Sequence, residues 1–144
     1  MTKETRHASS IAIDGAGILI SGPSGSGKSD LALRLIDRGA LLISDDYVDL
    51  HKDGTQIILN TPANIAGKIE IRSLGIFHCD HVSNIPLKLH VQLQPDPERF
   101  PLDSQTETIM TMTIATVTLN ALEASAPIKV EMALKQVLQQ TGQS

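Results

Sequence analysis

The chain has 144 residues, of which 41% are hydrophobic and 19% are charged, a composition typical of one compact globular domain and not of a disordered tail. Twelve basic and sixteen acidic residues give a net charge of −4, which argues against a domain that binds nucleic acid by neutralising its phosphates. No run of about 18 apolar residues is present to span a membrane, and the single cysteine, Cys79, cannot form an internal disulfide.

The beginning of the chain, MTKETRHASS, lacks the apolar stretch and cleavage site of a signal peptide, so we expect a cytoplasmic protein without a membrane partner. Only three residues are aromatic, namely Tyr47, Phe77 and Phe100. The core should therefore be aliphatic. A bound nucleotide should be held mainly by its phosphates, because side chains on which a base can stack are scarce.

The first third of the chain predicts a hairpin, a helix and a strand. Residues 11–13 (IAI) and the apolar run at 17–21 flank a turn at 14–15, which indicates a hairpin whose second strand is buried. Residues 28–38 (KSDLALRLIDR) carry apolar side chains at helical spacing and are followed by a glycine, a typical helix stop. A strand over 40–44 (ALLIS) comes next.

Three more strands are predicted in the middle of the chain. Residues 47–50 and 55–59 flank a turn at 52–54. From 85 to 94 apolar and polar residues alternate strictly, which predicts a strand with one buried face and one solvent-exposed face. The polar face would carry Lys88, His90, Gln92 and Gln94.

The last third predicts a loop, further strands and a helix. Three prolines make 95–105 a loop, and the Thr-rich segment 108–120 favours a strand pair or one long bulged strand. After Pro127, apolar residues at helical spacing predict an amphipathic helix that ends near Gly142. The whole pattern indicates a β-rich α/β domain.

Residues 22–29 read GPSGSGKS and match the phosphate-loop motif G-x-x-x-x-G-K-[ST] between an apolar strand and a helix. Its glycines let backbone N–H groups turn inward, and the helix N-terminus adds partial positive charge. Lys28 would reach the β- and γ-phosphates and Ser29 would bind Mg²⁺. The alternative is a strand-to-helix turn without a ligand. The predicted nucleotide-binding residues are Gly22, Pro23, Ser24, Gly25, Ser26, Gly27, Lys28 and Ser29.

Two adjacent acids, Asp45 and Asp46, follow the strand predicted over 40–44. In a strand–loop–helix–strand unit the two strands run in the same direction, so both acids should lie beside the phosphate loop. One carboxylate could hold Mg²⁺ while the other accepts the proton of an attacking hydroxyl. The alternative is an Asp-rich turn that opens a hairpin.

Three weaker features complete the set of candidates. His7 alone indicates little. Glu70 and Arg72 would share one face of a strand, as a surface ion pair or as part of a site. The segment His78-Cys79-Asp80-His81 has a His-x-x-His spacing, but without a distant set of partner ligands we predict no structural metal there.

The phosphate loop, the segment ISDDYV at 43–48, the block GKIEIRSLGI at 67–76 and His7 together resemble the catalytic domain of the HPr kinase/phosphorylase family. The loop alone is generic, whereas two acids at this distance followed by EIR-x-LG are specific to that family. The resemblance covers about residues 5–110. It implies a P-loop fold related to the nucleotide-binding domain of phosphoenolpyruvate carboxykinase.

The resemblance also implies an activity. Members transfer the γ-phosphate of ATP, with Mg²⁺, to a serine of the phosphocarrier HPr, and they reverse the reaction by phosphorolysis, in which inorganic phosphate becomes pyrophosphate. Carried over by position, Asp46 resembles the general base and proton donor and Asp45 its partner. His7 resembles a residue that assists the base.

Three further roles come from the resemblance alone. Glu70 resembles the carboxylate of the Mg²⁺ site, where it would act with Ser29, and Arg72 resembles a nearby residue that positions charge. Arg99, in PERFPLDSQT, stands where the family has a loop arginine important for dephosphorylation.

The chain also departs from the family pattern. Pro23 stands where Asp is frequent, and Ser73 replaces a usual glycine. The expected Gly-Arg-Asn after SAPIKV is missing, which bears on the usual hexamer, so a homo-oligomer is one option for this chain. We expect residues 1–144 to form a single catalytic domain without the N-terminal accessory domain.

Two other functions remain open at this point. A small-molecule kinase would share the phosphate loop but would normally need a lid with several arginines, and the loop at 95–105 offers only Arg99. A nucleotide-dependent regulatory switch would need no phosphoryl acceptor. The guanine-reading Asn-Lys-x-Asp element of a GTPase is absent. We rank a protein-serine kinase first.

Overall fold

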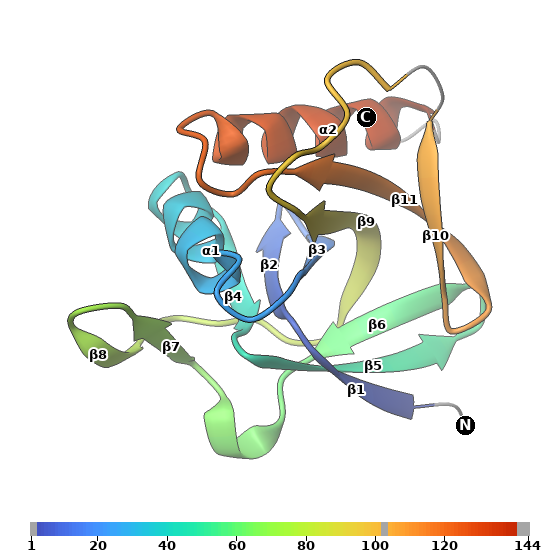
Figure 1. Cartoon of the computed structure of the whole chain (residues 1–144). Coiled ribbons are helices and arrows are strands. Elements are labelled where there is room, and N and C mark those ends of the chain that lie inside the picture. The colour runs from blue at the N-terminus through green and yellow to red at the C-terminus, as the bar shows by residue number, and fades with distance from the viewer. Residues whose placement is uncertain (1–2, 102–103, 141–144) are drawn as a thin grey trace.

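The computed structural model describes residues 3–101 and 104–140. Within these ranges the chain forms eleven strands, two α-helices and one 3-10 turn (Figure 1). The elements are β1 (Lys3–His7), β2 (Ser9–Ile13), β3 (Ala16–Ser21), α1 (Lys28–Asp37), β4 (Leu41–Ser44), β5 (Tyr47–Asp53), β6 (Gln56–Asn60), the 3-10 turn (Ala63–Ile65), β7 (Lys68–Ile71), β8 (Gly75–His78), β9 (Ile85–Leu93), β10 (Gln105–Ile109), β11 (Met112–Leu119) and α2 (Ala126–Gln140).

The long strand β9 lies at the centre of the main sheet. It runs parallel to β3 along one edge, while its other edge pairs with β6 at its start and, in parallel, with β11 at its end. The strand order is β1-β5-β6-β9-β3-β2-β4, and β10 extends the sheet beyond β11. β4 lies antiparallel to β2, which itself lies antiparallel to β3, so β3 and β4 run in the same direction. Their carboxyl ends therefore reach the same edge of the sheet, as the sequence predicts.

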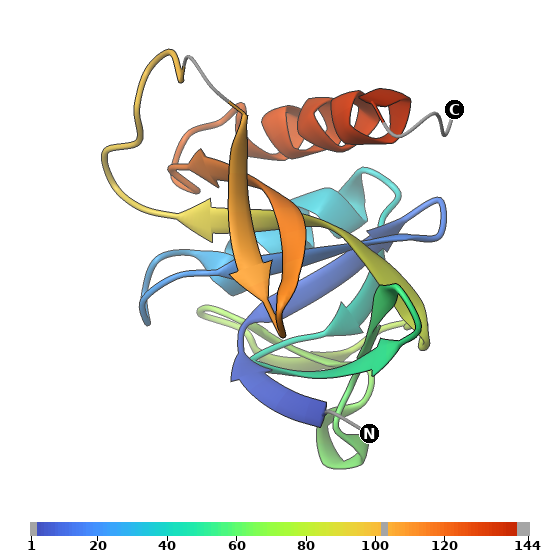
Figure 2. The same cartoon turned by 90° about the vertical axis from the view of Figure 1, so that its right-hand side faces the viewer.

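The core has two parts, one on each face of the central strands. Alternate residues of β3 point in opposite directions, as the period of a strand requires. Ile18 and Ile20 pack in the cluster that contains residues of α1 and α2, whereas Leu19 packs in the cluster formed with β5, β6 and the β10–β11 hairpin. Helix α2 and the strands β5 and β6 lie on opposite sides of the central strands (Figures 1 and 2).

None of the buried apolar residues in the described ranges is aromatic, and all but Met110 are aliphatic, which confirms the predicted aliphatic core. The three aromatic side chains lie outside it: Phe100 is 75% exposed, Tyr47 47% and Phe77 45%. None of the helices in these ranges combines the length and the apolar character that crossing a bilayer requires.

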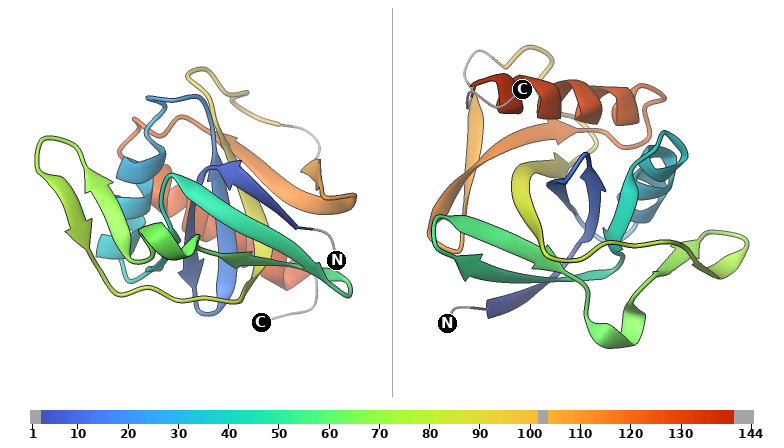
Figure 3. Two further views of the ribbon diagram at one scale, coloured as in Figure 1. Left: turned by 90° about the horizontal axis from the view of Figure 1, so that it is seen from below. Right: turned by 180° about the vertical axis from the view of Figure 1, so that it is seen from behind.

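The β7–β8 hairpin forms a separate two-stranded sheet beside the main one (Figure 3). A hydrogen bond from Cys79 N to Gly67 O closes its base, and a single parallel bridge joins Leu42 to His81. A two-stranded hairpin has little stability of its own. Its position therefore depends on such contacts with the body of the domain.

Most of the predicted elements are present within a residue or two of their expected bounds. The segment predicted over 108–120 is the strand pair β10–β11, which turns at Met110 and Thr111, both at positive φ. The last helix is present as α2, but its predicted end near Gly142 lies outside the described residues.

The prediction of a solvent-exposed polar face on β9 is wrong at His90, which is only 3% exposed. Strands β3 and β11 occupy both edges of β9 at this position, and Arg6 of β1 and Glu107 of β10 act electrostatically on the ring. Lys88 and Gln92 are half-buried. Alternation assigns residues to a face but does not show what covers it.

We expect Leu19→Ala to lower the free energy of unfolding by about 2–5 kcal/mol, because this fully buried side chain fills the centre of the sheet. Leu41, also in a strand but 45% exposed, provides the matched control, and Leu41→Ala should cost less than about 1 kcal/mol. Urea unfolding measures both variants. Equal losses would contradict this description of the core.

Candidate functional site

The phosphate loop lies between the end of β3 and the start of α1, as the motif predicts. Gly27 precedes the helix at φ 96°, a conformation that residues with a Cβ rarely adopt. A Cβ on Gly22 would lie 2.6 Å from Ser26 Oγ and 3.0 Å from Leu93 Cβ. Glycine at position 22 thus lets the loop pack against itself and against the end of β9.

Lys28 is 8% exposed and lies across the loop. Its Nζ donates hydrogen bonds to the carbonyl oxygens of Gly22, at 2.9 Å, and Pro23, at 3.1 Å. An ammonium group has three protons, so one donor remains for a phosphate oxygen.

Ser26 provides an independent test of whether the loop fits a phosphate. Among the described residues, its Oγ is the one buried side-chain oxygen or nitrogen without a hydrogen-bond partner. Buried polar atoms without partners are costly, and such cases call for an explanation. A phosphate oxygen would accept its proton, so the loop fits the nucleotide phosphates that the motif indicates.

Asp45 connects three elements of the fold. The residue is 5% exposed, and its Oδ1 accepts hydrogen bonds from Ser29 Oγ at 2.7 Å and from Ser9 Oγ at 2.9 Å. Its Oδ2 accepts a hydrogen bond from the backbone N–H of Glu70 at 3.1 Å. The carboxylate therefore joins α1, β2 and β7 at one point.

The Ser29–Asp45 pair places two oxygen donors beside the phosphate loop. Hydroxyl and carboxylate oxygens are the ligands that Mg²⁺ uses, usually together with phosphate oxygens and water. The residues present therefore fit a divalent cation bound with a nucleotide.

Asp46 faces a different environment from its neighbour. Its φ is 73°, and its side chain is 62% exposed. Its Oδ1 lies 2.9 Å from His7 Nε2, and the His7 ring packs against Tyr47 with 5.2 Å between centroids. The sheet thus brings together His7, Asp46 and Asp45, with one carboxylate buried and the other open to a second reactant.

Glu70 meets this group through its backbone. Its N–H binds Asp45, while its side chain and that of Arg72 are exposed on the β7–β8 hairpin. Within residues 3–101 and 104–140 no ion pair joins Glu70 to Arg72.

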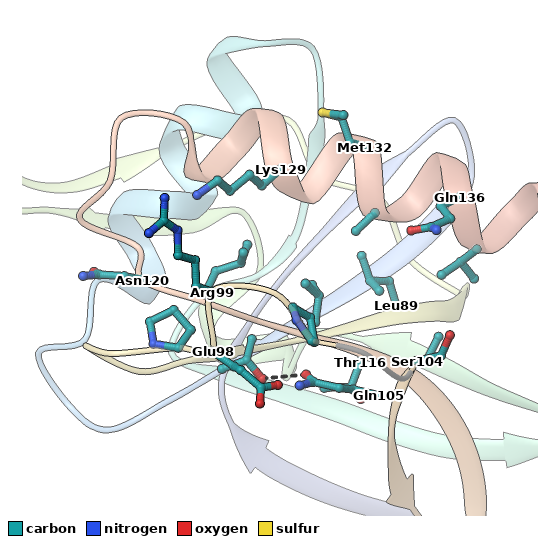
Figure 4. Close-up of a pocket in the computed structure, with 18 of the residues that line it drawn as sticks. Leu89, Glu98, Arg99, Ser104, Gln105, Thr116, Asn120, Lys129, Met132 and Gln136 are labelled. Atoms are coloured by element: carbon teal, nitrogen blue, oxygen red, sulfur yellow. Dashed lines mark hydrogen bonds between the residues drawn. The ribbon is translucent and has the colours of Figure 1, made fainter.

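Arg99 lies apart from this group, in the loop after β9. Its guanidinium carbon is 5.5 Å from the centroid of the Phe100 ring. The side chain lines a cavity of about 970 Å³ bounded by that loop, β11 and α2 (Figure 4). No residue of the phosphate loop is among the described residues that line the cavity.

Two contributors were not predicted from the sequence. Ser9 is 1% exposed and donates to Asp45, and Ser21, at the end of β3, contacts the buried His90. The sequence signal for Ser9 is a pair of serines, Ser9-Ser10, directly before the apolar run of β2. The sequence does not show that this serine contacts Asp45, because the contact follows from the pairing of β2 with β4.

Known proteins that are similar to this chain share one family description. The family model described as the HPr Serine kinase C-terminal domain matches residues 1–143. Curated proteins named HPr kinase/phosphorylase from Burkholderia lata and Burkholderia cenocepacia are 35% and 34% identical, and the match covers 96% of this chain and 47% of each of them. The chain thus spans about half the length of these relatives.

A solved structure resembles the whole fold. It is the structure of the Hpr(Ser) kinase/phosphatase from Coxiella burnetii, with a TM-score of 0.83 and 30% sequence identity. The match covers 96% of this chain and 99% of that one.

We expect Asp45→Ala to lower the free energy of unfolding by about 1–3 kcal/mol, because the N–H of Glu70 and the hydroxyl of Ser9 would lose their buried acceptor. Asp45→Asn should recover most of this loss, since the amide can turn its oxygen toward the N–H and donate to the hydroxyls. The exposed neighbour serves as the control, with Asp46→Asn changing stability little, because asparagine tolerates the positive φ of this residue. Urea unfolding measures the stability of all three variants. An Asp45→Ala variant as stable as the wild type would contradict the structural role of Asp45.

Proposed function

The chain belongs to the HPr serine kinase C-terminal domain family, and we propose that it transfers the γ-phosphoryl group of ATP to a seryl residue of an HPr-type phosphocarrier. The observation that carries this proposal is the division of two adjacent carboxylates: Asp45 is buried against Ser29 of the phosphate loop, and Asp46 is exposed beside His7. Such a division suits a kinase whose acceptor comes from solution.

The phosphate loop would hold the triphosphate of ATP. Its backbone N–H groups, the remaining proton of Lys28 and the hydroxyl of Ser26 would bind phosphate oxygens. Ser29 and Asp45 would hold Mg²⁺, which when bound offsets the charge that develops on the transferred group. The catalytic effect of these residues is mainly orientation and electrostatic stabilisation.

Asp46 would act as the general base. Its carboxylate accepts the proton of the seryl hydroxyl while the seryl oxygen bonds to the γ-phosphorus and the bond from that phosphorus to the bridging oxygen of ADP breaks. His7 holds the Asp46 carboxylate from the side. We propose that Glu70 adds a carboxylate to the Mg²⁺ site and that Arg72 positions charge near it.

The same residues would serve the reverse reaction. An oxygen of inorganic phosphate bonds to the phosphorus of phosphoserine, the bond to the seryl oxygen breaks, and the products are pyrophosphate and serine. Asp46 returns the proton to the serine, because a base in one direction is an acid in the other. We propose that Arg99 binds phosphate in this direction. Both directions would take place in the cytoplasm.

We expect Lys28→Ala to reduce phosphoryl transfer from ATP to an HPr-type carrier by about 100-fold or more, because the phosphates lose a buried positive charge. Lys52→Ala changes a lysine on β5, outside the phosphate loop, and should leave the rate unchanged. Transfer of labelled phosphate to the carrier is the measurement. Hydrolysis of ATP without labelling of the carrier would contradict the proposed activity and favour a nucleotide-dependent switch.

We expect Asp46→Asn to slow transfer by about 10²- to 10⁴-fold while ATP binding persists, because only the proton acceptor is removed. The same variant should slow the formation of pyrophosphate from inorganic phosphate and the phosphorylated carrier. Asp49→Asn, on β5, is the matched control. Undiminished transfer by Asp46→Asn would eliminate this residue as the base.

A further inference from the structure

A buried histidine lies directly behind the phosphate loop. His90 is 3% exposed in the middle of β9. Its Nε2 is 3.0 Å from Ser21 Oγ on β3, and its Nδ1 is 3.3 Å from Thr116 Oγ1 on β11. The ring thus spans from one neighbouring strand to the other, and the proposed reaction assigns it no role.

The contacts of Thr116 indicate which nitrogen carries the proton. Thr116 Oγ1 has one proton to donate and lies 3.1 Å from the carbonyl oxygen of Ile114, which can only accept. The assignment that satisfies this contact and both contacts of the ring gives the hydroxyl proton to Ile114 and places the ring proton on Nδ1. Nε2 is left as an acceptor, and the hydroxyl of Ser21 donates to it.

The surroundings keep the ring neutral. Burial lowers the pKa of His90, which is the largest effect on it. Of the charged groups that face the ring, Glu107 on β10 raises the pKa and Arg6 on β1 lowers it, so the two oppose each other. Ser21 on β3 and Thr116 on β11, the remaining contacts, are uncharged.

Ser21 is the last residue of β3, and the phosphate loop begins with the next residue, Gly22. The carbonyl of Gly22 accepts a hydrogen bond from Lys28 Nζ. A Cβ on Gly22 would lie 3.0 Å from Leu93 Cβ of β9. Strand β9 therefore touches the start of the loop twice, through His90 to Ser21 and through Leu93 to Gly22.

We propose that His90 is a positioning residue for the phosphate loop: as a neutral ring held by Thr116 it accepts the hydroxyl of Ser21, and this holds the residue before Gly22 in the place from which the loop and Lys28 bind phosphate. Its effect on transfer rests on the proposed function, whereas its effect on nucleotide binding does not depend on any acceptor. Because this role concerns the binding of phosphate, substitution of His90 should change the affinity for the nucleotide more than the rate of the chemical step.

Nucleotide affinity provides the first test, with ADP as the probe in isothermal titration. Loss of one buried hydrogen bond predicts that Ser21→Ala and His90→Leu each weaken ADP binding about 3- to 10-fold. The double variant should be no weaker than His90→Leu, because both remove the same link. His90→Gln should bind ADP within about twofold of the wild type, since its amide oxygen can accept from Ser21.

Thr118→Val is the matched control, since Thr118 lies on β11 but donates to Gln105 and not toward the loop. ADP affinity should not change in this variant. Wild-type affinity in both Ser21→Ala and His90→Leu would overturn the proposal. Ser21→Ala is a small change to a half-buried side chain, so it gives a result even if His90→Leu does not fold.

The ring nitrogens provide a second, direct test. In the protein labelled with ¹⁵N-histidine, NMR should find His90 neutral at pH 7 with its proton on Nδ1, and a proton on Nε2 would overturn the proposal. At acidic pH the His90 ring becomes protonated, and its Nε2 then donates instead of accepting. ADP affinity should therefore fall more steeply below pH 6.5, the ordinary pKa of histidine, in the wild type than in His90→Gln.

Phosphoryl transfer separates this proposal from the proposed function. The substitutions should raise KM for ATP while kcat changes little. A wild type that binds ADP but phosphorylates no carrier would contradict the proposed function alone. Variants that bind ADP like the wild type would contradict the role of His90 alone.

Discussion

The rest of the site depends on the hydrogen bonds that the buried carboxylate of Asp45 accepts. A buried carboxylate is tolerated only where hydrogen bonds replace its lost water, and Asp45 receives them from β2, α1 and β7. Those elements are far apart in the sequence. The hydrogen bonds to this one side chain therefore hold the helix that follows the phosphate loop, strand β2 and the β7–β8 hairpin close to one another. The hairpin is anchored at this point by the N–H of Glu70, next to the buried side chain of Ile69.

The sheet supplies the second constraint. β3 and β9 are parallel and end beside each other, so the phosphate loop begins where β9 also ends. Both faces of β3 carry aliphatic side chains that are buried in the core. The polar residues of the phosphate loop therefore follow the end of this strand. All three aromatic side chains are on the surface, and Tyr47 is the one that packs against a residue of the site, His7.

The sequence is informative where function depends on neighbouring residues in the chain. The phosphate loop, the adjacent Asp45 and Asp46 and the hairpins β2–β3 and β5–β6 are local patterns with a physical reason for each residue, and the structure has them at the predicted places. Strand β1 and the β7–β8 hairpin were not predicted. Contacts between distant segments could not be predicted in this way. Alternation placed His90 on the polar face of β9, but the burial of that face depends on β1, β3, β10 and β11. The backbone of Glu70, which binds Asp45, is likewise invisible to an argument about its side chain. Arg99 was grouped with the site by resemblance, while in the structure it lines a cavity between its loop, β11 and α2.

The central claim is that Asp45 and the phosphate loop together hold a nucleotide with its cation. Titration of ADP with and without Mg²⁺, in the wild type and in Asp45→Asn, tests it most directly, because the variant keeps hydrogen-bonding capacity and removes only the charge. The account requires Mg²⁺ to strengthen ADP binding in the wild type and to lose most of this effect in Asp45→Asn. An equal benefit of Mg²⁺ in both proteins would contradict it.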